Sequence, residues 1–162
     1  MKSKAVEIAQ TPLEKAADKT PDVKGHFCKG LSAVKGSDRV KFVVPDTYQL
    51  TGSIDIDSAT IEIYPEDNRW DYALEYAGET FFIEVHPCST SDVSRMINKL
   101  TWLKWWLKNK APKIDALKSK NEPYHWIATG GVGILKGSKY DKMLALNNIQ
   151  VVRQWTYSKI AK

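Results

Sequence analysis

Hydrophobic residues recur along the chain with two different periods, and each period predicts a different kind of element. Trp70–Ala77 and Thr80–His86 are short runs rich in β-branched and aromatic residues, which are typical of strands. Because only Gly78-Glu79 separates the two runs, we predict a β-hairpin. Residues 92–110 instead repeat apolar residues every three or four positions, which predicts a long amphipathic helix that ends near Pro112.

Shorter patterns predict the rest of the fold. Apolar residues on one face predict a helix over 3–19, in which Pro12 breaks the pattern or begins a second helix. Residues 138–147 indicate a further helix. Alternating or β-rich runs predict strands at 39–44, 53–57, 59–64, 124–129 and 149–157. A hairpin followed by alternating helices and strands favours an α/β fold with a mixed central sheet flanked by helices.

Length and composition limit the class of protein. The chain has 162 residues, of which 43% are hydrophobic and 27% charged, so we predict one globular domain over 1–162 with its core over roughly 40–157. No apolar run approaches the roughly 20 residues of a membrane helix, and the N-terminus has no apolar segment of a signal peptide. We therefore expect no membrane partner and a cytoplasmic location, with Cys28 and Cys88 as free thiols.

Charge is divided unevenly along the chain. Residues 1–86 hold 10 basic and 15 acidic side chains, whereas residues 87–162 hold 14 basic and 4 acidic ones. The stretch Asp55–Glu84 alone contains nine carboxylates and one base, Arg69. This division suits a protein that holds a cation and meets a polyanion such as DNA or RNA. The alternative is that these charges only form solvated faces.

Three residues with chemistry-bearing side chains lie on the predicted hairpin. Asp71 opens its first strand, and Glu84 and His86 lie near the end of the second. A turn at Gly78-Glu79 places Asp71 opposite His86, whereas a turn at Ala77-Gly78 places Asp71 opposite Glu84. Because strand side chains alternate between faces, either register puts all three on one face within cross-strand reach. A three-residue turn would send Asp71 to the other face.

The surroundings of Glu84 favour a functional carboxylate. Its neighbours at 81–83 and 85 are all aromatic or aliphatic, so this strand is predicted to be buried on both faces. A buried carboxylate costs several kcal/mol unless a cation or another partner meets it. Two carboxylates that converge at a strand end form an oxygen site suited to Mg²⁺. The alternative is an ordinary ion pair between Glu84 and Arg69 or a lysine of the following helix.

This arrangement resembles the PD-(D/E)XK nuclease superfamily, which has the restriction-endonuclease-like fold. That pattern is an acid, a gap, and then acid-any-lysine on the next strand; here Asp71 is followed after twelve residues by Glu84-Val85-His86. The family core of helix, three-stranded meander, helix and strand matches the predicted order from about residue 3 to 130. Two departures are Trp70 in place of the proline and His86 in place of the lysine.

The resemblance implies a metal-dependent nuclease that hydrolyses phosphodiester bonds in DNA or RNA. By this resemblance Asp71, Glu84 and the Val85 carbonyl hold Mg²⁺ or Mn²⁺, and His86 or Lys99 orients the attacking water. Loss of activity is the alternative, and the chain would then be an inactive nuclease-fold module that binds nucleic acid or protein. The candidates for an additional acid at the metal site are Asp55, Asp57, Glu7 and Glu14.

The long predicted helix carries a stripe of cations and aromatic residues beside its apolar face. Such mixtures are typical of nucleic-acid grooves. We expect the nucleic-acid contacts to come from Arg69, Arg95, Lys99, Trp102, Lys104, Trp106 and Lys108. The alternative is that the tryptophans cover the sheet or a neighbouring loop, or form the interface of a homodimer in a small structural subunit.

Overall fold

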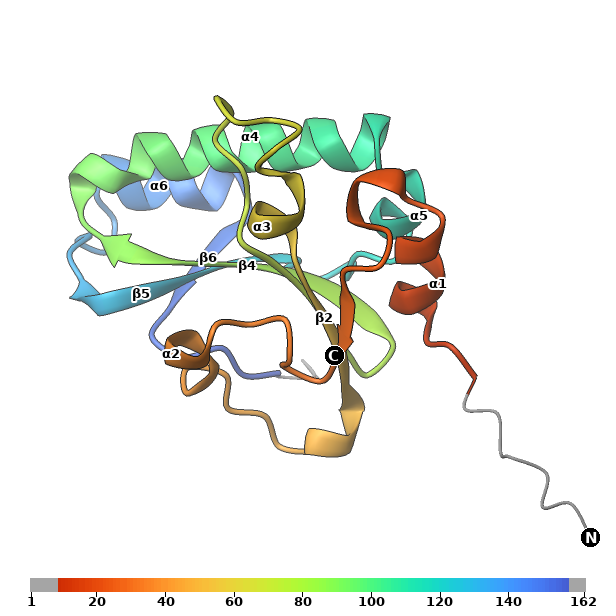
Figure 1. Ribbon diagram of the computed structural model, residues 1–162. Coiled ribbons are helices and arrows are strands. Elements are labelled where there is room, and N and C mark those ends of the chain that lie inside the picture. The colour runs from red at the N-terminus through yellow and green to blue at the C-terminus, as the bar shows by residue number, and fades with distance from the viewer. Residues whose placement is uncertain (1–8, 158–162) are drawn as a thin grey trace, which may run out of the picture.

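The computed structural model describes residues 9–157, which form a six-stranded β-sheet flanked by helices (Figure 1). The strands are β1 (Phe27–Lys29), β2 (Leu50–Asp55), β3 (Tyr72–Tyr76), β4 (Glu79–Cys88), β5 (Tyr124–Val132) and β6 (Ile149–Val152). They lie side by side in sequence order, antiparallel from β1 to β4 and parallel from β4 to β6. The predicted α/β class with a mixed central sheet is confirmed.

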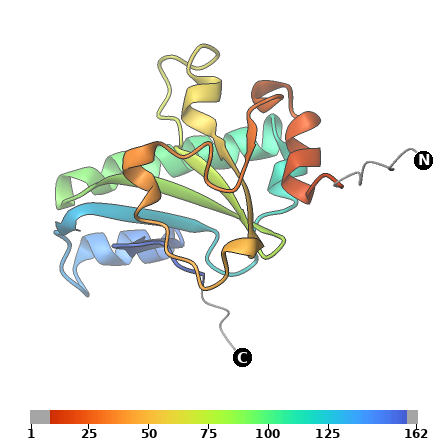
Figure 2. The same ribbon diagram turned by 60° about the horizontal axis from the view of Figure 1, so that its bottom comes forward.

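The helices divide unequally between the two faces of the sheet. The α-helices are α1 (Pro12–Asp18), α2 (Gly36–Arg39), α3 (Ile56–Thr60), α4 (Val93–Asn109), α5 (Pro112–Asp115) and α6 (Lys139–Leu146), and the 3₁₀ turns are η1 (Pro21–Val23), η2 (Thr47–Gln49) and η3 (Thr90–Asp92). Residues of α1, α3, α4, α5 and α6 share one hydrophobic cluster with one face of the sheet. The segment around α2 and the chain after β6 cover the other face, as Figure 2 shows from below.

Successive side chains of β4 point to opposite faces of the sheet, so this one strand contributes to both hydrophobic clusters. Phe82 belongs to the cluster on the α4 face, whereas Phe81 and Ile83 belong to the cluster on the opposite face. Glu84 has the same parity as Phe82, so it faces α4. The carboxylate of Glu84 therefore occupies a position on the α4 face where the alternation of the strand predicts an apolar residue.

The turn of the hairpin sets the register of the site. Tyr76 pairs with Glu79 across Ala77-Gly78, and Tyr72 pairs with Ile83. Ala77 and Gly78 have φ values of 52° and 79°, which is the backbone of a two-residue type I′ turn. The turn expected at Gly78-Glu79 is therefore wrong by one residue, and the alternative at Ala77-Gly78 holds.

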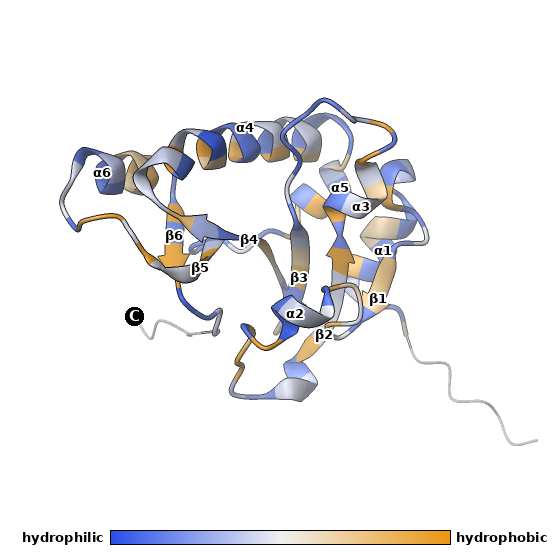
Figure 3. Ribbon diagram, turned by 60° about the vertical axis from the view of Figure 1, so that its left-hand side comes forward, coloured by the Kyte–Doolittle hydropathy of each residue, from blue (hydrophilic) through white to orange (hydrophobic). Residues whose placement is uncertain are grey.

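Helix α4 matches the predicted helix over 92–110 to within one residue at each end. Ser89 and Asp92 form a capping box at the η3 turn that leads into it. At its other end α4 stops at Asn109, and α5 begins with Pro112. Figure 3 shows orange and blue segments alternating along α4, as expected for a helix with one apolar side packed on the sheet.

Two predicted strands are wrong. The run at 39–44 begins with the last residue of α2 and continues into the segment before η2, where Phe42 makes only an isolated bridge with Trp155. The run at 59–64 includes the end of α3, because the Asp55 side chain accepts a hydrogen bond from the Ser58 amide and starts a helix there.

The predicted helix at 3–19 is shorter among the described residues. Helix α1 covers Pro12–Asp18, with the side chain of Thr11 as its N-cap and proline in its first turn. Residues 3–8 of that prediction lie outside the described residues. Between residues 9 and 157, no helix combines the length and the apolar character that crossing a membrane requires. Cys28 and Cys88 are free.

Candidate active site

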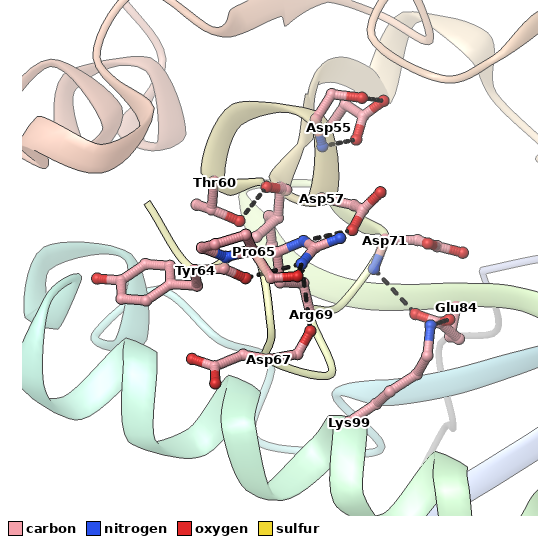
Figure 4. Close-up of polar contacts among 12 residues, drawn as sticks. Asp55, Asp57, Thr60, Tyr64, Pro65, Asp67, Arg69, Asp71, Glu84 and Lys99 are labelled. Carbon is pink, nitrogen blue, oxygen red and sulfur yellow. Dashed lines mark hydrogen bonds and ion pairs between the residues drawn. The ribbon is translucent and has the colours of Figure 1, made fainter. Parts of the chain in front are cut away.

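Asp71, Glu84 and Lys99 come together at one end of the sheet (Figure 4). The Asp71 amide donates a hydrogen bond to Glu84 Oε2 at 2.9 Å, and the Val85 amide donates one to Asp71 Oδ2 at 3.0 Å. Lys99 Nζ donates to Glu84 Oε1. Two carboxylates from neighbouring strands and one ammonium group from α4 are therefore linked in a single hydrogen-bonded set.

The fold explains why these three residues meet. Asp71 directly precedes β3, and the hairpin register places it beside Glu84 of β4. Glu84 faces α4, and Lys99 reaches it from the second turn of that helix. The placement of Asp71 beside Glu84 depends on the two-residue turn, because one inserted residue would move Asp71 to the other face of the sheet.

Burial dominates the electrostatics of the pair. Glu84 is 0% exposed, and burial together with the nearby Asp71 carboxylate raises its pKa to about 8, against the lowering effect of Lys99. Burial also raises the pKa of Asp71, while the Val85 amide and Lys99 act to lower it. One fully buried and one partly buried carboxyl group share a single ammonium group, so they are short of positive charge whenever both are ionised.

His86 does not join this set. Its Nδ1 lies 2.7 Å from the Pro87 carbonyl oxygen and 3.8 Å from Asp92 Oδ1. Within residues 9–157, no group of three or more His, Cys, Asp or Glu side chains lies close enough together to hold a metal ion. The expectation that His86 converges with Asp71 and Glu84 is therefore wrong, because its imidazole contacts the Pro87 carbonyl and lies near Asp92 of η3.

The additional acids proposed from the sequence have other partners. Asp55 caps α3 through the Ser58 amide and hydroxyl, at 2.9 and 2.8 Å. Glu14 lies in the first turn of α1 and lines a pocket with residues of β1 and β2, away from the three site residues. Glu7 lies outside the described residues.

Asp57 lies closest to the site among the proposed extra acids. It pairs with Arg69, whose Nε lies 2.8 Å from Asp57 Oδ1, and its charge acts to raise the pKa of Asp71. The guanidinium of Arg69 also donates to the carbonyls of Tyr64, Pro65 and Asp67 (Figure 4). Arg69 therefore folds the loop between α3 and β3 and is not a free cation for nucleic acid.

The tryptophans of the predicted stripe are core residues. Trp102 and Trp106 are 8% and 0% exposed, and their rings stack with centroids 5.8 Å apart. Trp106 Nε1 also donates to Asp22 Oδ2 at 3.0 Å. Neither ring is available for base stacking or for contact with a second copy of the chain. The predicted nucleic-acid contact and the alternative of a homodimer interface are therefore both wrong for these two residues. Trp105, at 42% exposure, remains accessible.

The basic residues of α4 divide between two places. Lys99 contacts Glu84, and Arg95 is exposed one turn earlier. Lys104 and Lys108 are exposed and line a separate pocket near the start of β5, together with Lys118 and Lys120. Lys108 lies nine residues beyond Lys99, which is about 13 Å along a helix.

Sequence reasoning missed the influence of Lys35 on Asp71. Its charge acts to lower the pKa of Asp71, although it lies in the irregular segment next to α2. The hydrogen bond from its amide to the Tyr72 hydroxyl, at 3.3 Å, holds this segment against the sheet. No local pattern reveals such a contact, because it arises from tertiary packing between residues 37 positions apart.

Comparisons with known proteins found no match to a family model, to a curated protein or to a solved structure.

Proposed function

We propose that the chain is a metal-dependent nuclease that hydrolyses phosphodiester bonds at the site formed by Asp71, Glu84 and Lys99. The observation that carries the proposal is the fully buried carboxylate of Glu84, hydrogen-bonded to the backbone of one acid and paired with one lysine. The element order α1, β2, β3, β4, α4 and β5 also follows the core of the PD-(D/E)XK superfamily that the sequence resembles.

A divalent cation fits the carboxylate pair. Burial raises the pKa of both acids, and the charge of Asp71 raises that of Glu84 further; a divalent cation between them would offset the charge of both. Asp71 Oδ1 accepts no hydrogen bond from any residue in 9–157, while Oδ2 is taken by the Val85 amide. Mg²⁺ needs only one or two carboxylates because waters and substrate oxygens complete its shell. Asp71 and Glu84 would hold the ion, with the Val85 carbonyl as the third ligand that the resemblance implies.

The bound ion supplies a Lewis acid for the phosphate and lowers the pKa of a coordinated water. The residues of this chain then have distinct tasks. Lys99 replaces the missing lysine of the motif and orients the water or a phosphate oxygen with its ammonium group. The water oxygen forms a bond to phosphorus and gives up one proton to the solvent, the bond from phosphorus to the leaving oxygen breaks, and that oxygen takes a proton from the solvent.

The charge of the chain favours a polyanionic substrate. Residues 87–162 carry 14 basic and 4 acidic side chains, so the half that begins at the end of β4 is strongly positive. Positive charge of this kind attracts the phosphates of DNA or RNA regardless of sequence. The site does not distinguish DNA from RNA, and both belong in the assay.

The test is cleavage of labelled single-stranded and double-stranded DNA and RNA with Mg²⁺ or Mn²⁺. Wild type should cleave at least one of these substrates, and chelation of the metal should stop it. Asp71→Asn and Glu84→Gln should each reduce the rate by at least 100-fold, since each removes a charge from the metal site. Lys99→Met should reduce the rate by roughly 100-fold, a typical size for loss of one positioned acid–base group.

Matched controls separate the site from general charge effects. Glu62→Gln removes an exposed carboxylate from the loop before β3, and Lys113→Met removes an exposed ammonium group from α5. Both variants should cleave like wild type. Cleavage that persists in both Asp71→Asn and Glu84→Gln would refute the proposed site. Lack of cleavage by wild type on every substrate with either metal would refute the proposed activity.

A further inference from the structure

A large pocket opens at the carboxyl ends of β5 and β6, outside the carboxylate pair. Its volume is about 1030 Å³. Its lining includes Val40, Lys41, Val43, Gly130, Gly131 and Arg153. They come from the segment after α2, the end of β5 and the chain that follows β6. None of the residues lining this pocket is acidic.

The topology places this pocket at the same edge of the sheet as the candidate active site, but the segments that carry Lys41 and Arg153 pack on the face opposite α4, so a nucleic-acid strand would pass around this edge to reach both. Strands β4, β5 and β6 run parallel, and β3 runs antiparallel to β4. The start of β3, with Asp71 beside it, therefore lies at the edge where β4, β5 and β6 end. Glu84 pairs with Trp126 of β5, and Gly130 lies four residues further on, which is about 13 Å along a strand.

Two cations line the pocket. Among the described residues, neither Lys41 nor Arg153 forms an ion pair with a carboxylate. The backbone on either side of Lys41 pairs with the backbone of Trp155. The Val43 amide donates a hydrogen bond to the Trp155 carbonyl at 2.9 Å, and the Trp155 amide donates one to the Lys41 carbonyl at 2.8 Å. This pairing holds the Lys41 segment next to the Arg153 segment. Two cations on paired segments suit a phosphate group.

The backbone at the end of β5 leaves room for close approach of a ligand. Gly130 and Gly131 have φ values of 77° and 114°, which favour glycine. A Cβ at either position would meet nothing within 4 Å, so open space lies above both peptides. The exposed Val40 and Val43, at 72% and 49% exposure, supply an apolar surface beside the two cations.

We propose that this pocket binds one nucleoside phosphate unit of a nucleic-acid strand, next to the unit cleaved at the carboxylate pair. This inference rests on the proposed function. Lys41 and Arg153 take the phosphate, the glycine peptides allow the strand to lie close to the sheet, and Val40 and Val43 contact the base or sugar. The phosphate contacts make the subsite independent of base sequence.

The test measures binding of a fluorescein-labelled 12-nucleotide single strand, as DNA and as RNA, in the presence of a chelator. Fluorescence anisotropy of the full chain gives Kd over a series of salt concentrations. The variant Lys41→Ala/Arg153→Ala should weaken binding about tenfold or more, since each lost charge-assisted contact is substantial. It should also lower the slope of log K against log salt by about 1.4, because single strands contribute roughly 0.7 per phosphate contact.

Two further variants keep the test specific. Lys24→Ala/Lys113→Ala removes the same charge from exposed positions outside both basic pockets, and its salt slope should stay close to that of wild type. Val40→Glu adds a negative charge at an exposed position and should weaken binding while the circular dichroism spectrum is unchanged. Equal losses in the two double variants, or wild-type binding by Val40→Glu, would overturn the subsite.

Failure of this inference differs from failure of the proposed function. If wild type cleaves nucleic acid and Lys41→Ala/Arg153→Ala binds like wild type, the subsite is refuted and the nuclease stands. If wild type never cleaves but only the pocket variants lose binding, the nuclease is refuted and the binding site stands.

Discussion

Removal of Lys99 tests the electrostatic description of the site through stability alone. Lys99 pairs with a carboxylate that is 1% exposed in its side chain. Lys99→Met keeps a long apolar stem in the same place and removes only the ammonium group. The change leaves Glu84 buried on β4 without its cation, and its cost must therefore depend on whether Glu84 is ionised.

The pKa of Glu84 determines the sign of that dependence. Its value in the folded chain is about 8, above the ordinary 4.5, so the folded chain binds a proton that the unfolded chain releases. The contribution of Glu84 to stability is therefore complete below about pH 4.5 and is lost as the pH rises through about 8. At 1.36 kcal/mol per pKa unit, the full loss in wild type is roughly 5 kcal/mol as an upper limit.

The expected cost of Lys99→Met follows from these states. At pH 5 Glu84 is protonated, and the variant loses one hydrogen bond, worth about 1 kcal/mol. At pH 9 wild type holds an ion pair, whereas loss of Lys99 raises the pKa of Glu84 further, so the variant must either protonate Glu84 or hold an unpaired buried charge, at a cost of up to about 3–5 kcal/mol. Glu84→Gln/Lys99→Met contains no carboxylate at this position, so its cost relative to Glu84→Gln should be the same at both pH values.

Urea unfolding followed by tryptophan fluorescence measures these free energies, and the chain has six tryptophans. Wild type, both single variants and the double variant are compared at pH 5, 7 and 9. The control is Lys113→Met, an exposed lysine whose removal should change stability by less than about 0.5 kcal/mol. An equal cost of Lys99→Met at pH 5 and pH 9 would refute the reasoning.

Three other substitutions test the parts of the fold that position the site. Ala77→Asn should raise the free energy of unfolding by about 0.5–1 kcal/mol, because Ala77 has a φ of 52° in a turn that favours Asn-Gly; thermal unfolding that shows a loss would contradict the assigned turn. Thr11→Ala should lower stability by about 1 kcal/mol through loss of the α1 N-cap to the Glu14 amide, measured against Thr90→Ala as an exposed control. Trp106→Phe should cost about 1–3 kcal/mol, because Asp22 loses a buried donor; an additional Asp22→Asn change should then cost less than it does in wild type.

The elements that were predicted correctly have long or redundant patterns. The helix that became α4 repeats its apolar residues over about five turns and has capping residues before it. The hairpin has two β-rich runs with almost no residues between them. The strands predicted at 39–44 and 59–64 failed because a few alternating residues do not distinguish a strand from a short helix or an irregular segment. In both places a local cap or a tertiary bridge decided the structure.

The site was predictable as far as the hairpin determines it. Hairpin register brings Asp71 beside Glu84, and helical spacing offers Lys99 as a partner from α4. The failure of His86 has a different cause, because its imidazole contacts the Pro87 carbonyl and lies near Asp92, and strand alternation does not predict these contacts. Trp106 likewise pairs with Asp22, which is 84 positions earlier in the sequence; its burial was one of the two alternatives that the sequence offered, but this partner could not be predicted from the periodicity of the helix.

The central claim is that Asp71 and Glu84 together hold a divalent cation, and titration of the chain with Mn²⁺ tests it most directly. Calorimetry at pH 8 should give one Mn²⁺ site in wild type and in Glu62→Gln. Asp71→Asn and Glu84→Gln should each weaken that site by at least tenfold while far-ultraviolet circular dichroism is unchanged. An Mn²⁺ affinity that is the same in wild type and in both site variants would contradict the account.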